Sequence, residues 1–381
     1  MEIKKTKGGY YYKIYKNGKK KRISKKEYLK RKYVNKMKGS GKLLKKCKSV
    51  IKNQTSNNLS SERNCLLNYS NINNFKNYIN LKKMNVMNNS GVFSTIYSTK
   101  IETNIDNLKK GDNVVLKKFN NSLLDKNNED LLEHVELLKT IIHPCLIKVY
   151  SCIIDSDDKY LIMEYVEGNN LLVCINTPKI YEKLEENNNL LLYVLIYQLL
   201  IGIKFLHNKN LTHRDLKPEN IMITDDYRVK IIDFDFLTNE NRNNDIRGSP
   251  LFLHPKKLIS NSFSNYLLDI WALGVCFYIM IFQNLPFNIP SNLLDLSPNQ
   301  KHILCAKIEK QQVEKTMERF PNKYHSISYD IKRLISLMLD YNNKSDMNFI
   351  CDNRQKWMKY LKKRTNVTNL KLYLNNLENY N

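Results

Sequence analysis

The sequence predicts an α+β fold of two lobes, in which a small β-rich lobe with one helix precedes a larger and mainly α-helical lobe. Strand-like segments dominate residues 84–165, one amphipathic stretch interrupts them at Glu129–Ile142, and long apolar segments of helical character follow. Strands that come first and helices that come later are typical of α+β folds. A chain of 381 residues has room for such a body and for flanking segments.

Four strands are expected in the first lobe, where short runs rich in β-branched and aromatic residues alternate with polar turns. These strands lie at Ser94–Thr99, Asn113–Phe119, Ile147–Ile154 and Tyr160–Tyr165. The amphipathic helix falls between the second strand and the third. We therefore assign residues 84–165 to the β-rich lobe.

The second lobe is expected to be helical. Apolar segments at 190–206 and 268–282 and a periodic segment near 329–340 predict its main helices. The longest apolar runs are shorter than the roughly 20 residues that a bilayer requires, so we interpret them as buried helices and expect no transmembrane segment. This lobe spans 166–342, and a Lys- and Asn-rich extension follows it at 343–381.

Positive charge is concentrated at the start of the chain. The formal net charge is +25, and residues 1–52 contain 21 Lys or Arg against two acids. Within this segment, Asn17-Gly18 is typical of a two-residue hairpin turn, and residues 24–27 have the pattern of a helix capping box. We expect a basic hairpin-helix module at 1–41, followed by an Asn-, Ser- and Lys-rich linker at 42–83.

A charge asymmetry of this size indicates a polyanionic partner such as a nucleic acid. Tyrosines interleaved with lysines can stack on bases while the lysines contact phosphates. A solvated basic arm or a nuclear-localisation-like run is the alternative. The segment GGYYYKIYKNGKKKRIS also resembles short basic tags on proteins of large DNA viruses, which implies a viral, virion-associated protein.

The cysteines indicate a reducing environment. Eight cysteines are scattered along the chain, and none forms a C-x-x-C pair. Neither a zinc ribbon nor a redox motif is therefore indicated. Scattered thiols without a recognisable secretory leader favour an intracellular location, in the cytoplasm of a host cell or in a virion if the protein is viral.

The most informative segment is His213-Arg214-Asp215-Leu216-Lys217-Pro218-Glu219-Asn220. Asp233-Phe234-Asp235 follows at a spacing of thirteen residues, directly after the strand-like Val229–Ile232. The two motifs resemble the catalytic loop and the metal-binding Asp motif of eukaryotic-type protein kinases. The resemblance covers about residues 84–342 and implies a protein-kinase-like fold.

The resemblance implies a role for each polar residue of these motifs. Asp215 would accept or orient the proton of the substrate hydroxyl, and Lys217 would offset charge on the transferring phosphate. Asn220 and Asp233 would each bind Mg²⁺, with Mn²⁺ as an alternative, because amide and carboxylate oxygens suit hard cations. Lys217 within Leu-Lys-Pro-Glu, together with Ser249, is typical of Ser/Thr kinases. The implied activity is transfer of the γ-phosphate of ATP to Ser or Thr hydroxyls of protein substrates.

The ATP-binding residues are expected in the first lobe. Lys117 in Val-Val-Leu-Lys resembles the third-strand lysine that contacts the α- and β-phosphates, and its neighbour Lys118 must point to the opposite face of the strand. Tyr160–Val166 (YLIMEYV) resembles the hinge strand of this family, in which Met163 would lie behind the adenine. The remaining ATP-binding candidates form an imperfect glycine loop with its following strand, and the hinge: Asn89, Ser90, Gly91, Val92, Ile96, Glu164 and Val166.

Several positions depart from the family pattern. Counting back from His143-Pro144 places His134 where a helix glutamate normally pairs with the strand lysine, and Glu133 or Glu136 can replace it only after a helix shift. Asp235 stands where glycine is usual, which removes backbone freedom. Lys256 and Lys344 occupy the two positions of a buried ion pair, so we expect that region to be remodelled or solvated.

Two further acids have expected structural or regulatory roles. Asp269 resembles the acid at the start of the central helix that bonds the backbone of the catalytic loop. Asp245 lies near the usual site of an activating phosphate, whose ordinary partner is Arg214. A fixed carboxylate there can order the loop without phosphorylation, which predicts constitutive activity. A surface acid in an Asn-rich loop is the alternative.

Two functions remain open at this stage. The first is an active, ATP- and Mg²⁺-dependent Ser/Thr protein kinase, supported by intact Lys117, Asp215, Asn220 and Asp233. The second is a catalytically impaired pseudokinase or scaffold, which the departures favour. In either case, the basic N-terminus can bind nucleic acid or another polyanion.

Overall fold

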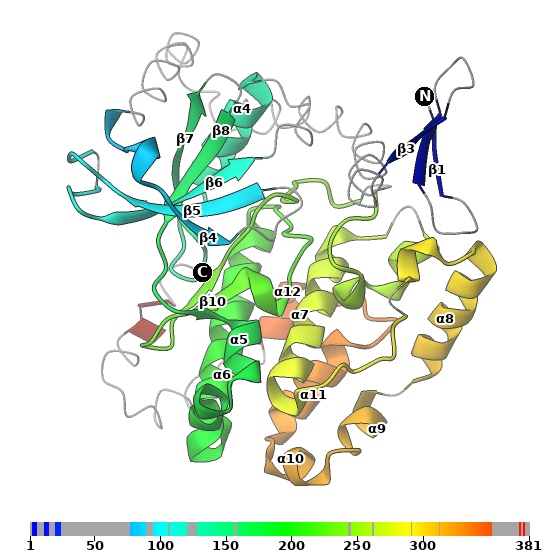
Figure 1. The fold of residues 1–381 in the computed structure, drawn as a ribbon. Helices are drawn as coiled ribbons and strands as arrows, with labels where there is room; N and C mark the ends of the chain where they lie inside the picture. The colour runs from blue at the N-terminus through cyan, green and yellow to red at the C-terminus, as the bar shows by residue number, and fades with distance from the viewer. Residues whose placement is uncertain are drawn as a thin grey trace, which may run out of the picture. The chain divides into compact units, whose positions relative to one another are not determined.

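The computed structural model divides into two compact units (Figure 1). One contains Met1–Thr140 and Lys148–Tyr165, and the other contains Ile141–Ile147 and Val166–Asn381. The residues that the structure describes are 2–5, 11–14, 20–23, 77–88, 94–105, 107–119, 128–155, 158–242, 245–260, 263–290, 292–311, 313–352, 373–374 and 376–377.

The first unit is built on a five-stranded antiparallel sheet with the order β4-β5-β6-β8-β7. Its strands are β4 (Asn85–Asn88), β5 (Ser94–Lys100), β6 (Asn113–Phe119), β7 (Val149–Asp155) and β8 (Asp158–Glu164). One face carries a buried cluster in which Val114 and Leu116 of β6 pack with Ile153, Tyr160 and Ile162. The alternation along β6 therefore directs every second side chain to this core.

Helix α4 (Asn128–Lys139) contacts β7 in this unit. Leu131, Val135 and Leu138 are buried, and their spacing of four and three residues places them on one face of the helix. The observed helix and the four predicted strands agree with the sequence analysis to within a few residues. Strand β4 was missed, because it is a short, polar edge strand whose Val86 and Met87 are exposed.

The second unit is mainly helical, and α6 and α7 pack against each other at its centre (Figure 1). Nearly all of α7 is buried, so its apolar sequence reflects the core of the unit. The helices are α5 (Leu171–Asn176), α6 (Pro178–Asn208), α7 (Asn265–Phe282), α8 (Pro298–Lys310), α9 (Val313–Met317), α10 (Pro321–Ser326), α11 (Tyr329–Met338) and α12 (Met347–Asp352).

Within the part of the chain that the structure describes, two helices are long and apolar enough to cross a membrane by length and composition alone: α6 over Asn188–Asn208, and α7. Most of each apolar stretch is buried inside the helical unit. Core helices of globular proteins have the same composition, so we retain the interpretation of both as buried core helices.

A small sheet of the second unit carries the segments that flank the candidate site. It consists of β9 (Asn169–Asn170), β10 (Ile221–Ile223) and β11 (Val229–Ile231), with β10 in the middle. Ile221 pairs with Ile231, so the end of the Asp215 loop lies beside the strand that leads to Asp233.

The N-terminal residues form a separate antiparallel sheet of β1 (Glu2–Lys5), β2 (Tyr11–Ile14) and β3 (Lys20–Ile23), with β2 in the middle. Strand β1 was not predicted from the sequence. The predicted Asn17-Gly18 turn, the helix after residue 24 and the linker at 42–83 lie outside the described residues. The C-terminal extension contributes α12 and the helical residues 373–374 and 376–377.

Candidate active site

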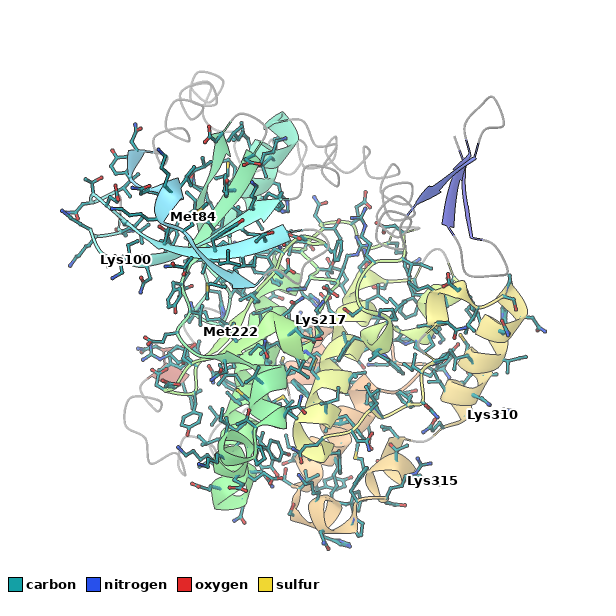
Figure 2. The ribbon with its side chains drawn as sticks, viewed as in Figure 1. Met84, Lys100, Lys217, Met222, Lys310 and Lys315 are labelled. Carbon is teal, nitrogen blue, oxygen red and sulfur yellow. The ribbon has the colours of Figure 1, made fainter. Side chains whose placement is uncertain are left out.

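Asp215 is the most highly connected side chain of the candidate site. Its Oδ1 atom accepts hydrogen bonds from the backbone N–H of Ser249 at 2.9 Å and from the Ser249 hydroxyl at 3.0 Å. Its Oδ2 atom accepts from Lys217 Nζ at 2.9 Å and from Asn220 Nδ2 at 3.1 Å. Lys217 can be followed in Figure 2. Three residues that were selected from the sequence therefore donate to the carboxylate of a fourth, Asp215, which is 7% exposed.

Lys217 and Asn220 each make a second contact that fixes the loop. Lys217 Nζ also donates to the Ser249 hydroxyl at 3.1 Å, and Asn220 Nδ2 also donates to the backbone carbonyl of Asp215 at 2.8 Å. Both bonds of the Asn220 amide use its nitrogen. The amide oxygen of Asn220 is therefore the atom that can coordinate a cation.

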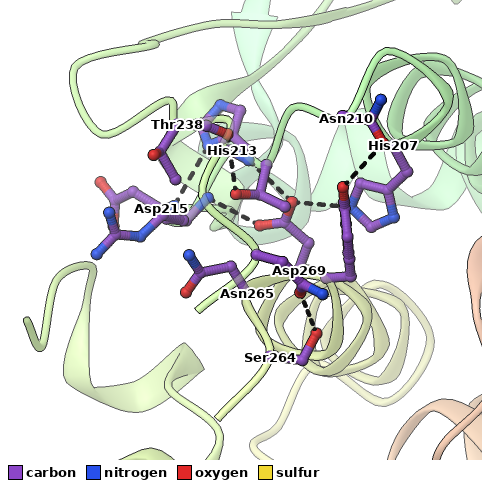
Figure 3. Close-up of polar contacts among 12 residues, drawn as sticks. His207, Asn210, His213, Asp215, Thr238, Ser264, Asn265 and Asp269 are labelled. Carbon is purple, nitrogen blue, oxygen red and sulfur yellow. Dashed lines mark hydrogen bonds and ion pairs between the residues drawn. The ribbon is translucent and has the colours of Figure 1, made fainter. Parts of the chain in front are cut away.

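Asp269 of α7 holds the backbone that precedes Asp215 (Figure 3). Its completely buried carboxylate accepts from the N–H groups of His213 and Arg214, both at 2.8 Å, and from His207 Nε2 at 3.0 Å. Arg214 has a φ of 69°, a left-handed conformation that costs about 1–2 kcal/mol in a non-glycine residue. The two backbone bonds to Asp269 offset this strain. The structure thus places Asp269 in the contact expected from the sequence.

The segment before Asp233 is bonded to the same loop. The N–H of Ile232 donates to the carbonyl of Asn220 at 2.9 Å, and His213 Nε2 donates to the carbonyl of Ile232 at 3.0 Å. Phe234 is buried and packs edge-on against the His213 ring. Asp233 itself is half-buried with a φ of 70°. Its backbone is therefore positioned by the residues on either side of Asp215.

Asp245 pairs with two guanidinium groups. Its carboxylate accepts from Arg214 Nη2 at 2.5 Å and also from Arg247 Nε. Burial raises the pKa of Asp245, but the Arg214 and Arg247 guanidinium groups outweigh it, so the pKa lies below its ordinary value. Asp245 is therefore held by two guanidinium groups and is only partly exposed.

Gly248 allows Ser249 to reach Asp215. Its φ is +94°, and a Cβ atom there would lie 2.4 Å from the carbonyl oxygen of Arg214. Any side chain would therefore push the loop away from Arg214. Glycine at this position explains why the Ser249 N–H and hydroxyl can both bond Asp215.

The residues that hold the segment at Glu240 and Asn241 were not predicted from the sequence (Figure 3). Asn265, completely buried in the first turn of α7, donates from Nδ2 to the carbonyl of Glu240 and from its N–H to the carbonyl of Asn241, both at 2.6 Å. Ser264 Oγ donates to Asn241 Oδ1 at 2.7 Å. A buried amide at the start of an apolar helix was the available signal, together with His207 near the end of α6.

The first unit holds the predicted phosphate-binding lysine. Lys117 is 4% exposed on β6, opposite Ile96 of β5 and Leu161 of β8. Its neighbour Lys118 points to the other face, where it pairs with Asp158 at 2.5 Å. Strand alternation therefore places the two lysines on opposite faces of the sheet, Lys118 on the face of Val114 and Leu116 and Lys117 on the other face, and Lys117 is the more buried of the two.

The hinge candidates occupy the end of β8 and the residues after it. The N–H of Glu164 donates to the carbonyl of Lys148 at 2.9 Å, so only the Glu164 carbonyl can face a nucleotide. Met163 lies opposite Val115, and Val166 is half-buried. Asn89, Ser90, Gly91 and Val92 lie outside the described residues, whereas Ile96 is half-buried on β5.

Helix α4 does not present either glutamate next to its buried face. With about 100° per residue, His134 lies about 70° from the centre of the Leu131, Val135 and Leu138 face. Glu133 and Glu136 lie more than about 130° from it. Glu136 also pairs with Lys139 of the same helix at 3.0 Å. The register therefore favours His134, not a glutamate, at the position next to the sheet.

The expected rearrangement around Lys256 has a definite form. Lys256 Nζ donates to Asn342 Oδ1 at 2.7 Å and lies 4.5 Å from the centre of the Tyr341 ring, while Lys344 is exposed. An amide and an aromatic face thus replace the ion pair. His254 is buried against aromatic rings that include Trp271, and burial lowers the pKa of His254 to about 3.

Asp235 adopts a conformation that needs no glycine. It lies in a turn closed by the Leu237 N–H and the Phe234 carbonyl at 3.1 Å. Among the described residues, Asp233 has a positive φ but Asp235 does not. The substitution of the usual glycine therefore introduces no left-handed strain in this conformation.

A β-sheet unit with a buried strand lysine and a helical unit with an Asp-Lys-Asn loop are the parts of a protein-kinase fold. The sequence matches the protein kinase domain family over residues 89–358. The chain belongs to this family, and its mixed α+β architecture is the one expected from the sequence.

Named relatives are Ser/Thr or calcium-dependent protein kinases. Serine/threonine-protein kinase ULK3 of Xenopus laevis is 33% identical over 52% of this chain and 41% of its own length. CBL-interacting serine/threonine-protein kinase 15 of Arabidopsis thaliana is 26% identical over 66% of this chain and 55% of its own length. Calcium-dependent protein kinase 5 of Plasmodium falciparum is 29% identical over 64% and 40%. The chain thus spans about half the length of these relatives.

Proposed function

We propose that this chain is an active Ser/Thr protein kinase that transfers the γ-phosphate of ATP to protein hydroxyls. The observation that carries the proposal is the set of bonds from Lys217, Asn220 and Ser249 to the Asp215 carboxylate. This arrangement orients a buried base beside a cation and a potential metal ligand, which phosphoryl transfer requires. The Ser/Thr kinase names of the relatives support the same acceptor class.

In the proposed reaction, the substrate hydroxyl oxygen attacks the γ-phosphorus, and the bond to the β,γ-bridging oxygen breaks to release ADP. Asp215 accepts the hydroxyl proton, while Lys217 offsets negative charge on the transferring phosphoryl group. The Asn220 oxygen and the Asp233 carboxylate would hold Mg²⁺ or Mn²⁺, which neutralises phosphate charge when bound. Within the described residues, no group of three acidic, His or Cys side chains lies close enough together to hold a metal ion.

On the same proposal, ATP is bound by the residues selected in the first unit and at its end. Lys117 contacts the α- and β-phosphates, and the Glu164 carbonyl and the Val166 backbone bond the adenine. Asn89, Ser90, Gly91 and Val92 keep the phosphate-binding role proposed for them from the sequence, and Ile96 is proposed to contact the base. The buried position of Lys117 supports this assignment.

The test is phosphate transfer from labelled ATP to a basic protein substrate in the presence of Mg²⁺. We expect Asp215→Asn to lower kcat by a factor of about 10²–10⁴, because a positioned base is lost. Asp225→Asn, an exposed acid on the β10–β11 turn, is the matched control and should retain full activity. Equal rates for Asp215→Asn and the native chain would exclude the proposed role.

A pseudokinase is the second candidate, and the specific observation in its favour is His134 on α4. A histidine cannot supply the negative charge that normally holds the strand lysine. Nucleotide binding without detectable transfer, unchanged by Asp215→Asn, would favour this candidate.

The segment between Asp233 and Lys256, here termed the activation loop, is proposed to need no phosphorylation to adopt its active conformation. Between Asp233 and Lys256, the sequence contains only two hydroxyl side chains, those of Thr238 and Ser249. Ser249 bonds Asp215, and the Thr238 hydroxyl accepts from the Glu240 N–H at 3.1 Å. Asp245 supplies the negative charge between Arg214 and Arg247. Phosphatase-treated protein should therefore keep its full activity.

Residues 1–52 are proposed to bind a polyanion, for which their high positive charge is the support. The register of the N-terminal sheet places Lys4, Tyr12 and Arg22 opposite one another. Such binding to a nucleic acid should weaken steeply with salt because counterions are released. Affinity that does not change between low and high salt would exclude this electrostatic account.

A further inference from the structure

The end of the chain contains a docked segment, here termed the C-terminal anchor and defined by Tyr373, Leu374 and Leu377. The side chains of Leu374 and Leu377 are both 0% exposed. The described residues of the segment are helical, and positions 373, 374 and 377 share one helical face. In an Asn-rich stretch, these fully buried leucines identify a packed contact rather than a solvated tail.

Tyr373 contacts two residues that lie far earlier in the chain. Its hydroxyl is 3.6 Å from Cys145 Sγ, and the Arg228 guanidinium lies 5.0 Å from the centre of its ring. Burial raises the pKa of Tyr373 and raises that of Cys145 to about 12, so both groups are neutral at physiological pH. The contact is therefore a neutral hydrogen bond to sulfur together with a cation–π contact.

Cys145 belongs to the segment 141–147, which is bonded to β11. The N–H of Ile231 donates to the Cys145 carbonyl at 2.8 Å, and the N–H of Ile147 donates to the Ile231 carbonyl at 2.9 Å. Gly202 lets α6 pack closely against this segment, because a Cβ atom there would lie only 3.2 Å from Cys145 Cβ and from Ile231 Cδ1. Segment 141–147 is thus held by α6 and β11, with the anchor bonded to the Cys145 side chain.

Strand β11 leads directly to the candidate metal ligand. Ile231 is its last residue, and Asp233 follows two positions later. The anchor, by contrast, lies beyond residue 358, where the match to the family ends. The contact between Tyr373 and Cys145 is therefore an addition of this chain to the common fold.

We propose that the C-terminal anchor clamps segment 141–147 against β11 and thereby orients Asp233, with Tyr373 as a positioning residue. The inference rests on the proposed function, in which Asp233 holds the metal of ATP. Tyr373 acts through Cys145 and Ile231 and does not contact substrate. Loss of the anchor should loosen β11 and weaken the metal-dependent part of nucleotide binding.

The first test is hydrogen–deuterium exchange of the full chain without nucleotide. We expect Tyr373→Ala to accelerate exchange of the Ile147 and Ile231 amides about tenfold, equivalent to about 1.4 kcal/mol of local opening. Tyr329→Ala, an exposed tyrosine on α11, is the control and should leave these amides unchanged. Unchanged exchange in Tyr373→Ala would overturn the clamp, whatever the activity of the chain.

The second test is the Mg²⁺ dependence of binding to a fluorescent ATP analogue. Tyr373→Ala should raise the Mg²⁺ concentration for half-maximal binding by about threefold to tenfold, within the usual range of coupling between sites. A purely structural anchor would lower the fraction of folded protein without moving this midpoint. Faster exchange with an unmoved midpoint would overturn the orienting role.

A milder variant protects the tests against a folding failure. Tyr373→Phe retains the ring over Arg228 and removes only the hydroxyl bonded to Cys145. It should accelerate exchange at Ile231 less than Tyr373→Ala does, and identical exchange in Tyr373→Phe and the native chain would exclude the hydroxyl contact. Phosphate transfer is measured separately, so failure of the proposed function does not affect the exchange result.

Discussion

At the scale of single residues, two carboxylates organise the loops of the candidate site. Asp215 collects donors from Lys217, Asn220 and Ser249, and Asp245 lies between Arg214 and Arg247. Each carboxylate orients residues that are far apart in sequence, because charged acceptors form stronger hydrogen bonds than neutral ones. The geometry of the loops therefore depends on charges as much as on packing.

Asp245→Asn should destabilise the chain by about 2 kcal/mol at pH 7, because two guanidinium groups lose their charged acceptor. The pKa of Asp245 is lowered in the folded chain, so its stabilisation is complete above the ordinary value of 3.8 and is lost as the pH falls through the folded value. Urea unfolding at pH 7 and at a series of pH values below 3.8 checks both statements. A difference between variant and native chain that stays constant as the pH falls until the native chain unfolds would contradict them.

His254 makes stability depend on pH in a separate window. Burial lowers its pKa from 6.5 to about 3, so the unfolded chain binds a proton that the folded chain does not. Stability should therefore fall as the pH decreases below 6.5, by about 2–3 kcal/mol per 2 pH units from this residue. His254→Asn keeps an acceptor for the Lys256 N–H and should show a shallower decline in thermal unfolding. Identical slopes would argue against this origin.

At the scale of elements, strand alternation and helix register decide which charged residues can serve the site. Alternation on β6 buries the Lys117 side chain on one face of the sheet, whereas Lys118 lies on the other face and pairs with Asp158. Register on α4 places His134, and not Glu133 or Glu136, beside the buried face. Strand β6 therefore supplies the lysine that nucleotide binding requires, whereas α4 lacks a glutamate at the position that would pair with it.

Lys117→Met should lower kcat/KM for ATP by about 100-fold, the usual loss when one preorganised charge contact is removed. Lys118→Met is the matched control on the same strand and should change kcat/KM less than about twofold, because its partly exposed ion pair with Asp158 lies on the face opposite Lys117. Steady-state kinetics with varied ATP measures both. A larger loss for Lys118→Met would reverse the assignment of the two lysines.

His134→Glu should raise kcat/KM for ATP about tenfold, because a carboxylate at this register position can pair with the strand lysine. Glu133→Gln, one position away on the helix, is expected to leave kcat/KM for ATP unchanged. The same kinetic assay applies to both variants. A gain that is absent in His134→Glu, or a loss in Glu133→Gln, would show that the register argument is wrong.

At the scale of the whole molecule, contiguous patterns could be predicted and isolated contacts could not. The catalytic loop and the four main strands are continuous in sequence, so the motif predicted the loop and the residue pattern predicted the strands. Asn265 and His207 are single polar residues in helices, and their partners lie tens of residues away. Tyr373 and Leu377 lie in a polar stretch whose burial depends entirely on tertiary packing.

The departures also became interpretable only in three dimensions. Lysines at 256 and 344 predicted a remodelled or solvated region, but not its form, in which Lys256 contacts Asn342 and Tyr341. Asp235 in place of glycine predicted a loss of backbone freedom, and its φ, which is not positive, shows that this conformation does not need that freedom. Local sequence reveals which interaction is missing, whereas the replacement depends on side chains that the fold brings near.

The most direct measurement is a structure of the full chain with Mg²⁺ and a non-hydrolysable ATP analogue. We expect the metal to be coordinated by the Asn220 oxygen and the Asp233 carboxylate, and Lys117 Nζ to lie within hydrogen-bond distance of the α- or β-phosphate. Asp215 should face the γ-phosphate. A nucleotide bound away from Lys117, or a metal that contacts neither Asn220 nor Asp233, would contradict the proposed convergence of these residues on one triphosphate.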